Sequence, residues 1–186
     1  MVHQTTTDLR NWGPIVNDVR YDDFSFRPGM PIVSELPFGN YIMTYEFVGA
    51  EEANLAVYYR ISDSPLTFDS KPGMVVRATD GTIPIGSPTN VWTPAGGPLG
   101  TIVVSSGDGT EVFLNHDLGA GAWTKYHTPA GASYTRNLMV MRDPSQILIT
   151  GGGALGGQNN NVLATSIDVT PRGPVRAECN AKDSGH

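Results

Sequence analysis

The sequence predicts an all-β fold, on the evidence of its apolar stretches, its turn residues and its lack of helical periodicity. The apolar stretches are short and rich in β-branched and aromatic residues, and Gly, Pro, Asp or Asn punctuates each one. Glycine and proline make up 22 plus 14 of the 186 residues, about a fifth, against a usual share of about 12%. No window of a dozen residues keeps a 3.6-residue period with caps at both ends, so no long helix is expected.

Composition excludes several classes of function. The chain has 12 basic and 18 acidic residues, a formal net charge of -6 and no Lys/Arg cluster, which argues against binding to nucleic acid or to an anionic membrane. One cysteine cannot form an intramolecular disulfide, and the four histidines (His3, His116, His127 and His186) lack the spacing of a metal site. We therefore expect no metal and no cofactor. No apolar run is long enough to span a membrane.

A repeat runs through the chain. Val2–Trp12, Ala56–Phe68 and Glu111–Trp123 each contain a strand, a small polar residue, an Asp, a turn and an aromatic residue. The aspartates are Asp8, Asp63 and Asp117, at intervals of 55 and 54, and a weaker copy, Val162–Pro171, places Asp168 a further 51 residues on. A period near 50 with about four strands in each unit is typical of the blades of a β-propeller.

The strands expected from the apolar stretches follow this period. Residues 1–20 would supply only the two outer strands of a preceding blade, and blades are expected at 27–80, 84–130 and 133–170, with a tail at 171–186. In chain order, the strands of these blades are Met30–Leu36, Asn40–Phe47, Leu55–Ile61 and Gly73–Arg77; Asn90–Thr93, Gly100–Ser105, Glu111–Asn115 and Ala122–His127; and Arg136–Met141, Gln146–Thr150 and Val162–Asp168. The chain thus holds about half of a closed ring. Because an open ring leaves bare flanks, we expect it to self-associate, and to be the C-terminal half of a larger protein.

The repeated aspartates are expected to be structural. An Asp in a tight turn accepts hydrogen bonds from backbone N–H groups a few residues on, and the aromatic residue that follows (Trp12, Phe68 or Trp123) would fill the space between sheets. The turns resemble degenerate Asp-box turns of sialidase-type propellers, whose pattern is Ser-x-Asp-x-Gly-x-Thr-Trp. Only Asp63, with Thr67 and Phe68, keeps that spacing.

The expected topology also brings candidate functional residues to one face. In an antiparallel blade, the start of the innermost strand, the end of the second strand and the loop after it lie on the same face. Arg27, Glu46, Tyr134 and Arg136 then converge near the axis, where propellers bind ligands. A carboxylate beside a phenol and two guanidinium groups suits a carbohydrate site, with the carboxylate as nucleophile.

Further residues on this face are candidates of lower rank. Asn90 and Trp92 are candidate substrate-binding residues, although Trp92 suits the core or the funnel wall better than a sugar platform. The loop charges, which are expected to be solvated, are Glu51, Glu52 and Asp108.

Structural roles stay open for the main candidates. Glu46 suits a buried ion-pair partner of Arg27 or Arg136 as well as it suits a nucleophile, and Tyr134 suits packing between blades. Tyr45, one residue from Glu46 in a strand, points to the opposite side and is expected in the core.

A resemblance to a known family rests on five runs of sequence. They are RPGMPIVSELPFGNYIMTYEF (Arg27–Phe47), VYYRISDSPLTFD (Val57–Asp69), VWTPAGGPLGTIVVSS (Val91–Ser106), WTKYHTPAGASYTRNL (Trp123–Leu138) and ILITGGG (Ile147–Gly153). These runs resemble the C-terminal half of fungal glycoside hydrolase family 93, and the resemblance extends from Val2 to about Val169.

The resemblance implies a six-bladed, sialidase-like propeller, and a secreted retaining exo-1,5-α-L-arabinanase that acts on linear arabinan of the plant cell wall. By this resemblance, Glu46 matches the catalytic nucleophile and Tyr134 an active-site tyrosine, while Arg27 and Arg136 resemble residues that line the funnel. The family's second carboxylate, its general acid/base, is expected in the half that precedes Met1, because nothing in this chain matches it. Met1–Gln4 does not begin a signal peptide.

Three functions therefore stay open. The first is part of a retaining arabinan hydrolase, with an arabinan-like polysaccharide or oligosaccharide as its partner. The second is a non-catalytic propeller module that binds glycans, and the third is a polysaccharide lyase that uses Tyr134 with Arg27 and Arg136.

Overall fold

The computed structural model describes residues 1–20, 26–107, 110–128, 134–152 and 162–170. Within these ranges the regular structure consists of strands and one short 3-10 helix, η1 (Pro37–Gly39), so the predicted all-β fold is confirmed. No helix in the described ranges has the length and apolar character needed to cross a bilayer.

The strands form four antiparallel sheets. A two-stranded sheet pairs β1 (Val2–His3) with β2 (Val16–Asn17). The next sheet has the order β3 (Arg27–Glu35), β4 (Tyr41–Val48), β5 (Ala56–Ser62) and β6 (Met74–Val75). A second four-stranded sheet follows with β7 (Thr89–Thr93), β8 (Thr101–Ser105), β9 (Glu111–Asn115) and β10 (Thr124–His127). The last sheet contains β11 (Tyr134–Val140), β12 (Gln146–Gly152) and β13 (Val162–Asp168).

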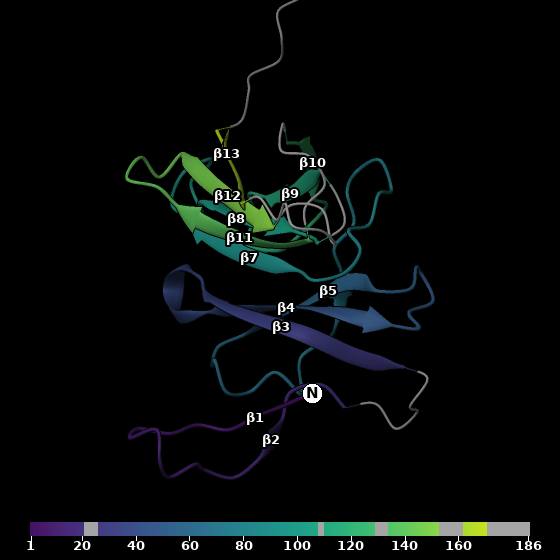
Figure 1. The fold of residues 1–186 in the computed structure, drawn as a ribbon, viewed down its shortest axis with the longest axis vertical. Helices are drawn as coiled ribbons and strands as arrows, with labels where there is room; N and C mark the ends of the chain where they lie inside the picture. Colours follow the sequence, from purple (N-terminus) through teal and green to yellow (C-terminus); the bar gives the residue numbers. More distant parts are fainter. Residues whose placement is uncertain (21–25, 108–109, 129–133, 153–161, 171–186) are drawn as a thin grey trace, which may run out of the picture.

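Along the long axis of the molecule, β1 and β2 lie at one end, β3–β5 come next, and the β7–β10 and β11–β13 sheets overlap in the view toward the other end (Figure 1). The last three sheets meet one another through their first strands, since β3 contacts β7 and β7 contacts β11. Four-stranded meanders whose first strands gather together are the arrangement of propeller blades around an axis. The fold is a partial β-propeller. The tail predicted at 171–186 lies outside the described residues.

Apolar side chains fill the space between successive sheets. Between the two four-stranded sheets, a cluster includes Ile42 and Val57 on one side and Ile102, Phe113 and Trp123 on the other. A second cluster joins β8 and β9 to the last sheet, and a third joins the two-stranded sheet to β4. Because every described sheet is apolar on the faces that its neighbours cover, each blade depends on its neighbours for burial.

Strand β4 distributes its side chains between two of these clusters. Ile42 packs toward the β7–β10 sheet, whereas Met43, Tyr45 and Phe47 pack with Val19 toward the two-stranded sheet. Tyr45 is only 2% exposed, so its predicted place in the core is confirmed. The alternation sends the even-numbered side chains of β4, including Glu46, to the side of β7.

Asp63 and Asp117 follow the third strand of a sheet and Asp8 follows the equivalent strand β1, whereas Asp168 is the last residue of β13. The prediction of what closes the turns was only partly right. Asp8 acts as predicted: its Oδ1 accepts from the backbone N–H groups of Arg10 at 2.9 Å and Asn11 at 2.8 Å. These hydrogen bonds lower the pKa of Asp8, and the bond from the Asn11 backbone N–H has the largest effect.

In the other two turns the last strand residue takes this role. Asn115, 2% exposed, accepts from the amides of Asp117 and Gly119 and donates to Ala120 O at 2.9 Å. Ser62 accepts from the amide of Ser64 and donates to Thr67 O at 2.7 Å. Asp63 and Asp117 point to solvent instead. The side chain at the strand end is buried, so its hydrogen bonds close the turn away from competing water.

The aromatic residues after the turns differ in the same way. Phe68 and Trp123 are each 1% exposed and pack between sheets, as predicted. Trp12 is 56% exposed, so the prediction was wrong for the first copy, where no second sheet of the described chain covers the ring.

We expect Asn115→Ala to lower the free energy of unfolding by about 2 to 3 kcal/mol. The substitution removes three hydrogen bonds and leaves the backbone groups of the turn without their partner. Asp117→Ala, two residues away, should cost less than about 0.5 kcal/mol, since that side chain is exposed. Urea unfolding of the two variants measures both values. Equal losses would show that the aspartate closes the turn after all.

Candidate functional site

The predicted carboxylate Glu46 lines a pocket of about 340 Å³ between the two four-stranded sheets. The end of β4, the start of β3, the turn before β7 and the end of β8 meet there. The residues that line the pocket are Arg27, Met30, Glu46, Leu55, Ile85, Gly86, Ser87 and Gly107. The structure therefore brings Arg27 and Glu46 to one pocket, on the face where the sequence placed them.

Backbone groups surround the Glu46 carboxylate. Its Oε2 accepts a hydrogen bond from the amide of Ser87 at 2.8 Å. Its Oε1 lies over Gly29, where an added Cβ would stand 3.3 Å from that oxygen. Arg27 is exposed, and no ion pair found among the described residues involves Glu46. The neutral Ser87 amide, rather than the Arg27 guanidinium, is the group that contacts the carboxylate.

Tyr134 and Arg136 begin β11, the first strand of the last sheet. Their backbones pair with Gly152 and Gly151 of β12, with a register shift between the two pairs. The roles predicted for their side chains lie outside what the structure describes, and so does Asp108.

Asn90 links two sheets rather than facing the pocket. It is 5% exposed, and its Nδ2 donates to Thr44 Oγ1 at 2.7 Å and to Ile32 O at 2.9 Å. Ser34 on β3 returns a hydrogen bond to the Asn90 carbonyl at 3.2 Å. The Asn90 Oδ1 is buried and has no hydrogen-bond partner among the described residues, so its donor alone links β7 to β3 and β4.

Trp92 packs against the core cluster between the two four-stranded sheets. Its indole Nε1 donates to Leu99 O at 3.1 Å, in the loop that joins β7 to β8. The pocket that contains Glu46 lies at the other end of β7, beside Ser87. Trp92 therefore packs on the core and holds the β7–β8 loop, away from the pocket. The sequence also favoured a core position for this residue.

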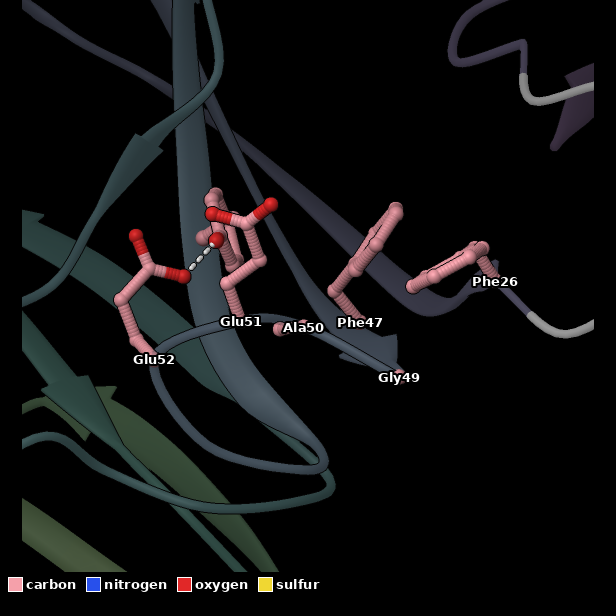
Figure 2. Close-up of a pocket in the computed structure, with 7 residues that line it drawn as sticks. Phe26, Phe47, Gly49, Ala50, Glu51 and Glu52 are labelled. Carbon is pink, nitrogen blue, oxygen red and sulfur yellow. Dashed lines mark hydrogen bonds between the residues drawn. The ribbon is translucent and has the colours of Figure 1, made fainter.

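The loop after β4 borders a second, aromatic pocket of about 270 Å³ (Figure 2). Phe26 and Phe47 form one side of it, and Glu51 and Glu52 stand on the loop at the other. Both glutamates are exposed, as expected of loop charges. The Tyr58 hydroxyl donates to the Glu52 carboxylate, and this hydrogen bond is the main cause that lowers the pKa of Glu52.

His116 lies at the opposite end of the β7–β10 sheet from the Glu46 pocket, at the end of β9 with Asn115. Its Nδ1 is 2.8 Å from Thr101 Oγ1, and burial lowers its pKa. Across the ranges that the structure describes, no group of three or more His, Cys, Asp or Glu could hold a metal ion.

The contact between Ser87 and Glu46 was not predicted from the sequence. Neither Gly29 nor Gly107 was assigned a role. The signal for this part of the site was the Gly86-Ser87-Pro88 turn immediately before a first strand, because such a turn points backbone N–H groups at the ligand face.

Comparisons with known proteins place this geometry in context. Neither a protein-family model nor a curated protein matches the chain. A solved α-L-arabinofuranosidase of glycoside hydrolase family 93 from Fusarium graminearum, in complex with arabinobiose, is 44% identical over 90% of this chain, with a TM-score of 0.85. An α-L-arabinanase from Penicillium chrysogenum, also complexed with arabinobiose, is 43% identical over 90% of this chain, with a TM-score of 0.83.

The chain covers 50% of the Fusarium graminearum structure and 49% of the Penicillium chrysogenum structure, so it spans about half the length of the proteins it matches. At this identity the likeness goes beyond fold. The predicted resemblance to glycoside hydrolase family 93 is confirmed.

We expect Asn90→Ala to destabilise the protein by about 1 to 3 kcal/mol, because the Ile32 carbonyl and the Thr44 hydroxyl would lose their buried donor. As a control, Asn54→Ala removes an asparagine whose Oδ1 accepts from Gly49 N in an exposed loop, and it should cost less. Urea unfolding measures the two changes. If the free energy of unfolding of Asn90→Ala equals that of the native chain, Asn90 does not hold the sheets together and is again a candidate for contact with a ligand.

Proposed function

We propose that this chain is part of a retaining glycoside hydrolase that acts on α-L-arabinofuranosyl linkages of arabinan, with Glu46 as its nucleophile. The observation that carries the proposal is a half-buried glutamate in a pocket between blades, in a chain 44% identical to an enzyme solved with arabinobiose. Because arabinan is a cell-wall polysaccharide, the proposal includes action outside the cell.

The pocket supplies one of the two carboxyl groups that the reaction requires. A retaining glycosidase uses one carboxylate to attack the anomeric carbon and a second carboxyl group, about 5 to 5.5 Å away, to protonate the leaving oxygen. Among the described residues that line the pocket, Glu46 is the only acid. We therefore assign the acid/base to the half of the enzyme that this chain does not span.

Two further features of the pocket support a sugar ligand. Three of the residues that line it are small, Gly86, Ser87 and Gly107, which leaves room for a ring close to Glu46. The exposed Arg27 at its edge has five N–H donors for hydroxyl groups of a bound oligosaccharide. In the proposed role Arg27 binds substrate, and Tyr134 and Arg136 at the start of β11 complete the same funnel from the next blade.

The test uses this chain joined to the half of the Fusarium graminearum enzyme that it does not span, a protein called the hybrid below. We expect the hybrid to release arabinose or short arabino-oligosaccharides from linear arabinan, and the 186-residue chain alone to release almost none. In the hybrid, Glu46→Gln should lower kcat by about 10³-fold or more, because the amide cannot form the glycosyl ester. Chromatography of the released sugars gives the rates.

Glu51→Gln in the hybrid is the matched control, since Glu51 is an exposed carboxylate on the neighbouring loop and should leave kcat within about twofold of the parent. Equal rates for Glu46→Gln and the parent hybrid would mean that Glu46 is structural. The glycan-binding function would then be preferred, with arabinobiose binding to the chain as its measurement.

We also expect the chain to self-associate through its open flanks. An apolar side chain stands exposed at each flank: Val33 on β3 is 44% exposed, and Met139 on β11 is 63% exposed. Sedimentation velocity at rising protein concentration should show species larger than the monomer, and Met139→Lys should reduce them. A single monomeric species at high concentration contradicts this prediction.

A further inference from the structure

The turn before β7 holds an amide against Glu46 in a conformation that side chains rarely adopt. Gly86 has φ +69° and Ser87 has φ +35°, so two successive residues lie in the left-handed region. Such a pair turns successive N–H groups toward one side, and the Ser87 N–H reaches Glu46 Oε2 at 2.8 Å. Glycine adopts this region without cost, but serine does not.

The surroundings of the turn keep Ser87 in this conformation. Gly86 N donates to Leu55 O at 2.9 Å, and Gly107 N donates to Gly86 O at 3.0 Å. These bonds tie the turn to the end of the β4–β5 loop on one side and to the loop after β8 on the other. An otherwise unfavourable backbone conformation persists where neighbouring contacts fix it in this way.

Two glycines leave the space that the arrangement needs. At Gly107 an added Cβ would stand 2.7 Å from the Ser87 Cβ, closer than carbon atoms can pack, so any side chain there displaces the turn. At Gly29 an added Cβ would stand 3.3 Å from Glu46 Oε1. One glycine thus permits the contact with Oε2, and the other keeps the approach to Oε1 open.

We propose that the two oxygens of Glu46 have separate roles, with Oε2 held by the Ser87 amide and Oε1, over Gly29, as the atom that attacks the anomeric carbon. This inference rests on the proposed function and deepens it. Ser87 is a positioning residue in this scheme, and it acts through its backbone N–H rather than its hydroxyl. Gly29 determines access to the reacting oxygen.

The chemical step balances with water as the only co-reactant. The bond from Oε1 to the anomeric carbon forms while the glycosidic C–O bond breaks, and the electron pair of that bond stays on the leaving oxygen. The leaving oxygen takes a proton from the carboxylic acid that the proposed function assigns to the half of the enzyme that this chain does not span. Water, deprotonated by the resulting carboxylate, then attacks the anomeric carbon and returns Glu46 to its ionised form. Throughout, the Ser87 N–H keeps Oε2 from rotating into the place of Oε1.

The hydrogen bond is tested by NMR on the 186-residue chain itself. The Ser87 amide proton should lie further downfield when the Glu46 carboxyl is ionised than when it is protonated, because a charged acceptor makes the stronger hydrogen bond; its shift is followed from acid to neutral pH. Glu46→Gln should abolish this shift, while Glu51→Gln should leave it. A Ser87 resonance that ignores Glu46→Gln would overturn the inference.

A double-mutant cycle separates positioning from a general loss of structure. Gly107→Ala should abolish the pH-dependent shift of the residue-87 amide, because its Cβ pushes Ser87 away. Ser87→Gly keeps the amide and removes the Cβ that collides, so the Ser87→Gly/Gly107→Ala chain should recover the shift. If the double variant is folded but shows no pH-dependent shift, packing at Gly107 does not control this amide. That result would contradict the positioning role proposed for Ser87.

The role of Oε1 is tested by activity in the hybrid. Gly29→Ala should lower kcat by about 10- to 100-fold with KM within about twofold, because the new methyl group crowds the attacking oxygen without blocking the rest of the pocket. Gly97→Ala is the control, since an added Cβ there meets its nearest atom at 3.8 Å, in the loop between β7 and β8. Equal kcat values for the two variants would overturn the assignment of Oε1.

These results distinguish the inference from the function on which it rests. If Glu46→Gln removes activity but the Ser87 amide does not titrate with Glu46, the nucleophile stands and the proposed division between its oxygens is wrong. If the amide titrates as expected but Glu46→Gln leaves activity intact, the hydrogen bond is real and structural, and the proposed function fails.

Discussion

The structure depends on the covering of both faces of β4. Ile42 on one face is fully buried against the β7–β10 sheet, and Met43 and Tyr45 on the other are almost fully buried toward the two-stranded sheet. A strand enclosed on both sides cannot slip by one residue without exchanging its two apolar sets. This constraint fixes the side on which Glu46, on the same face of the strand as Ile42, emerges, and so fixes the position of the pocket.

Polar contacts then define what lies opposite β4. Asn90 spans from β7 to Thr44 and to the Ile32 carbonyl, at the same face of β4 and two residues from Glu46. Because these bonds are shielded from water, they fix the position of β7 along β4 more tightly than apolar packing alone can. The Gly86–Ser87 turn leads directly into β7, so the register that Asn90 fixes also brings the Ser87 amide to the Glu46 carboxylate. A residue that sequence reasoning assigned to the substrate acts on the site through the framework.

The sequence predicted the strands and the face that carries Glu46, because both follow from local alternation and from antiparallel order. Glu111–Asn115 and Val162–Asp168 agree with the structure at both ends. What it could not predict was which of several adjacent polar residues is buried. Asn115 and Asp117 are both good turn formers, and only the packing of the finished sheet decides that Asn115 closes the turn. Asn90 was assigned to the substrate for the same reason, since an amide suits a sugar as well as it suits a core, whereas the core role favoured for Trp92 agrees with its packing.

The choice of a backbone amide as the partner of Glu46 has a chemical consequence. A guanidinium in contact with the carboxylate would neutralise its charge and occupy both oxygens in a bidentate pair, which opposes nucleophilic attack. A single neutral N–H satisfies one oxygen and leaves the negative charge and a lone pair on the other. An amide also belongs to the backbone, so its position is fixed by the turn and not by the rotamers of a long side chain. The Ser87 turn, which is hydrogen-bonded to Leu55 and Gly107, therefore orients the Glu46 carboxylate and leaves its negative charge available for the proposed reaction.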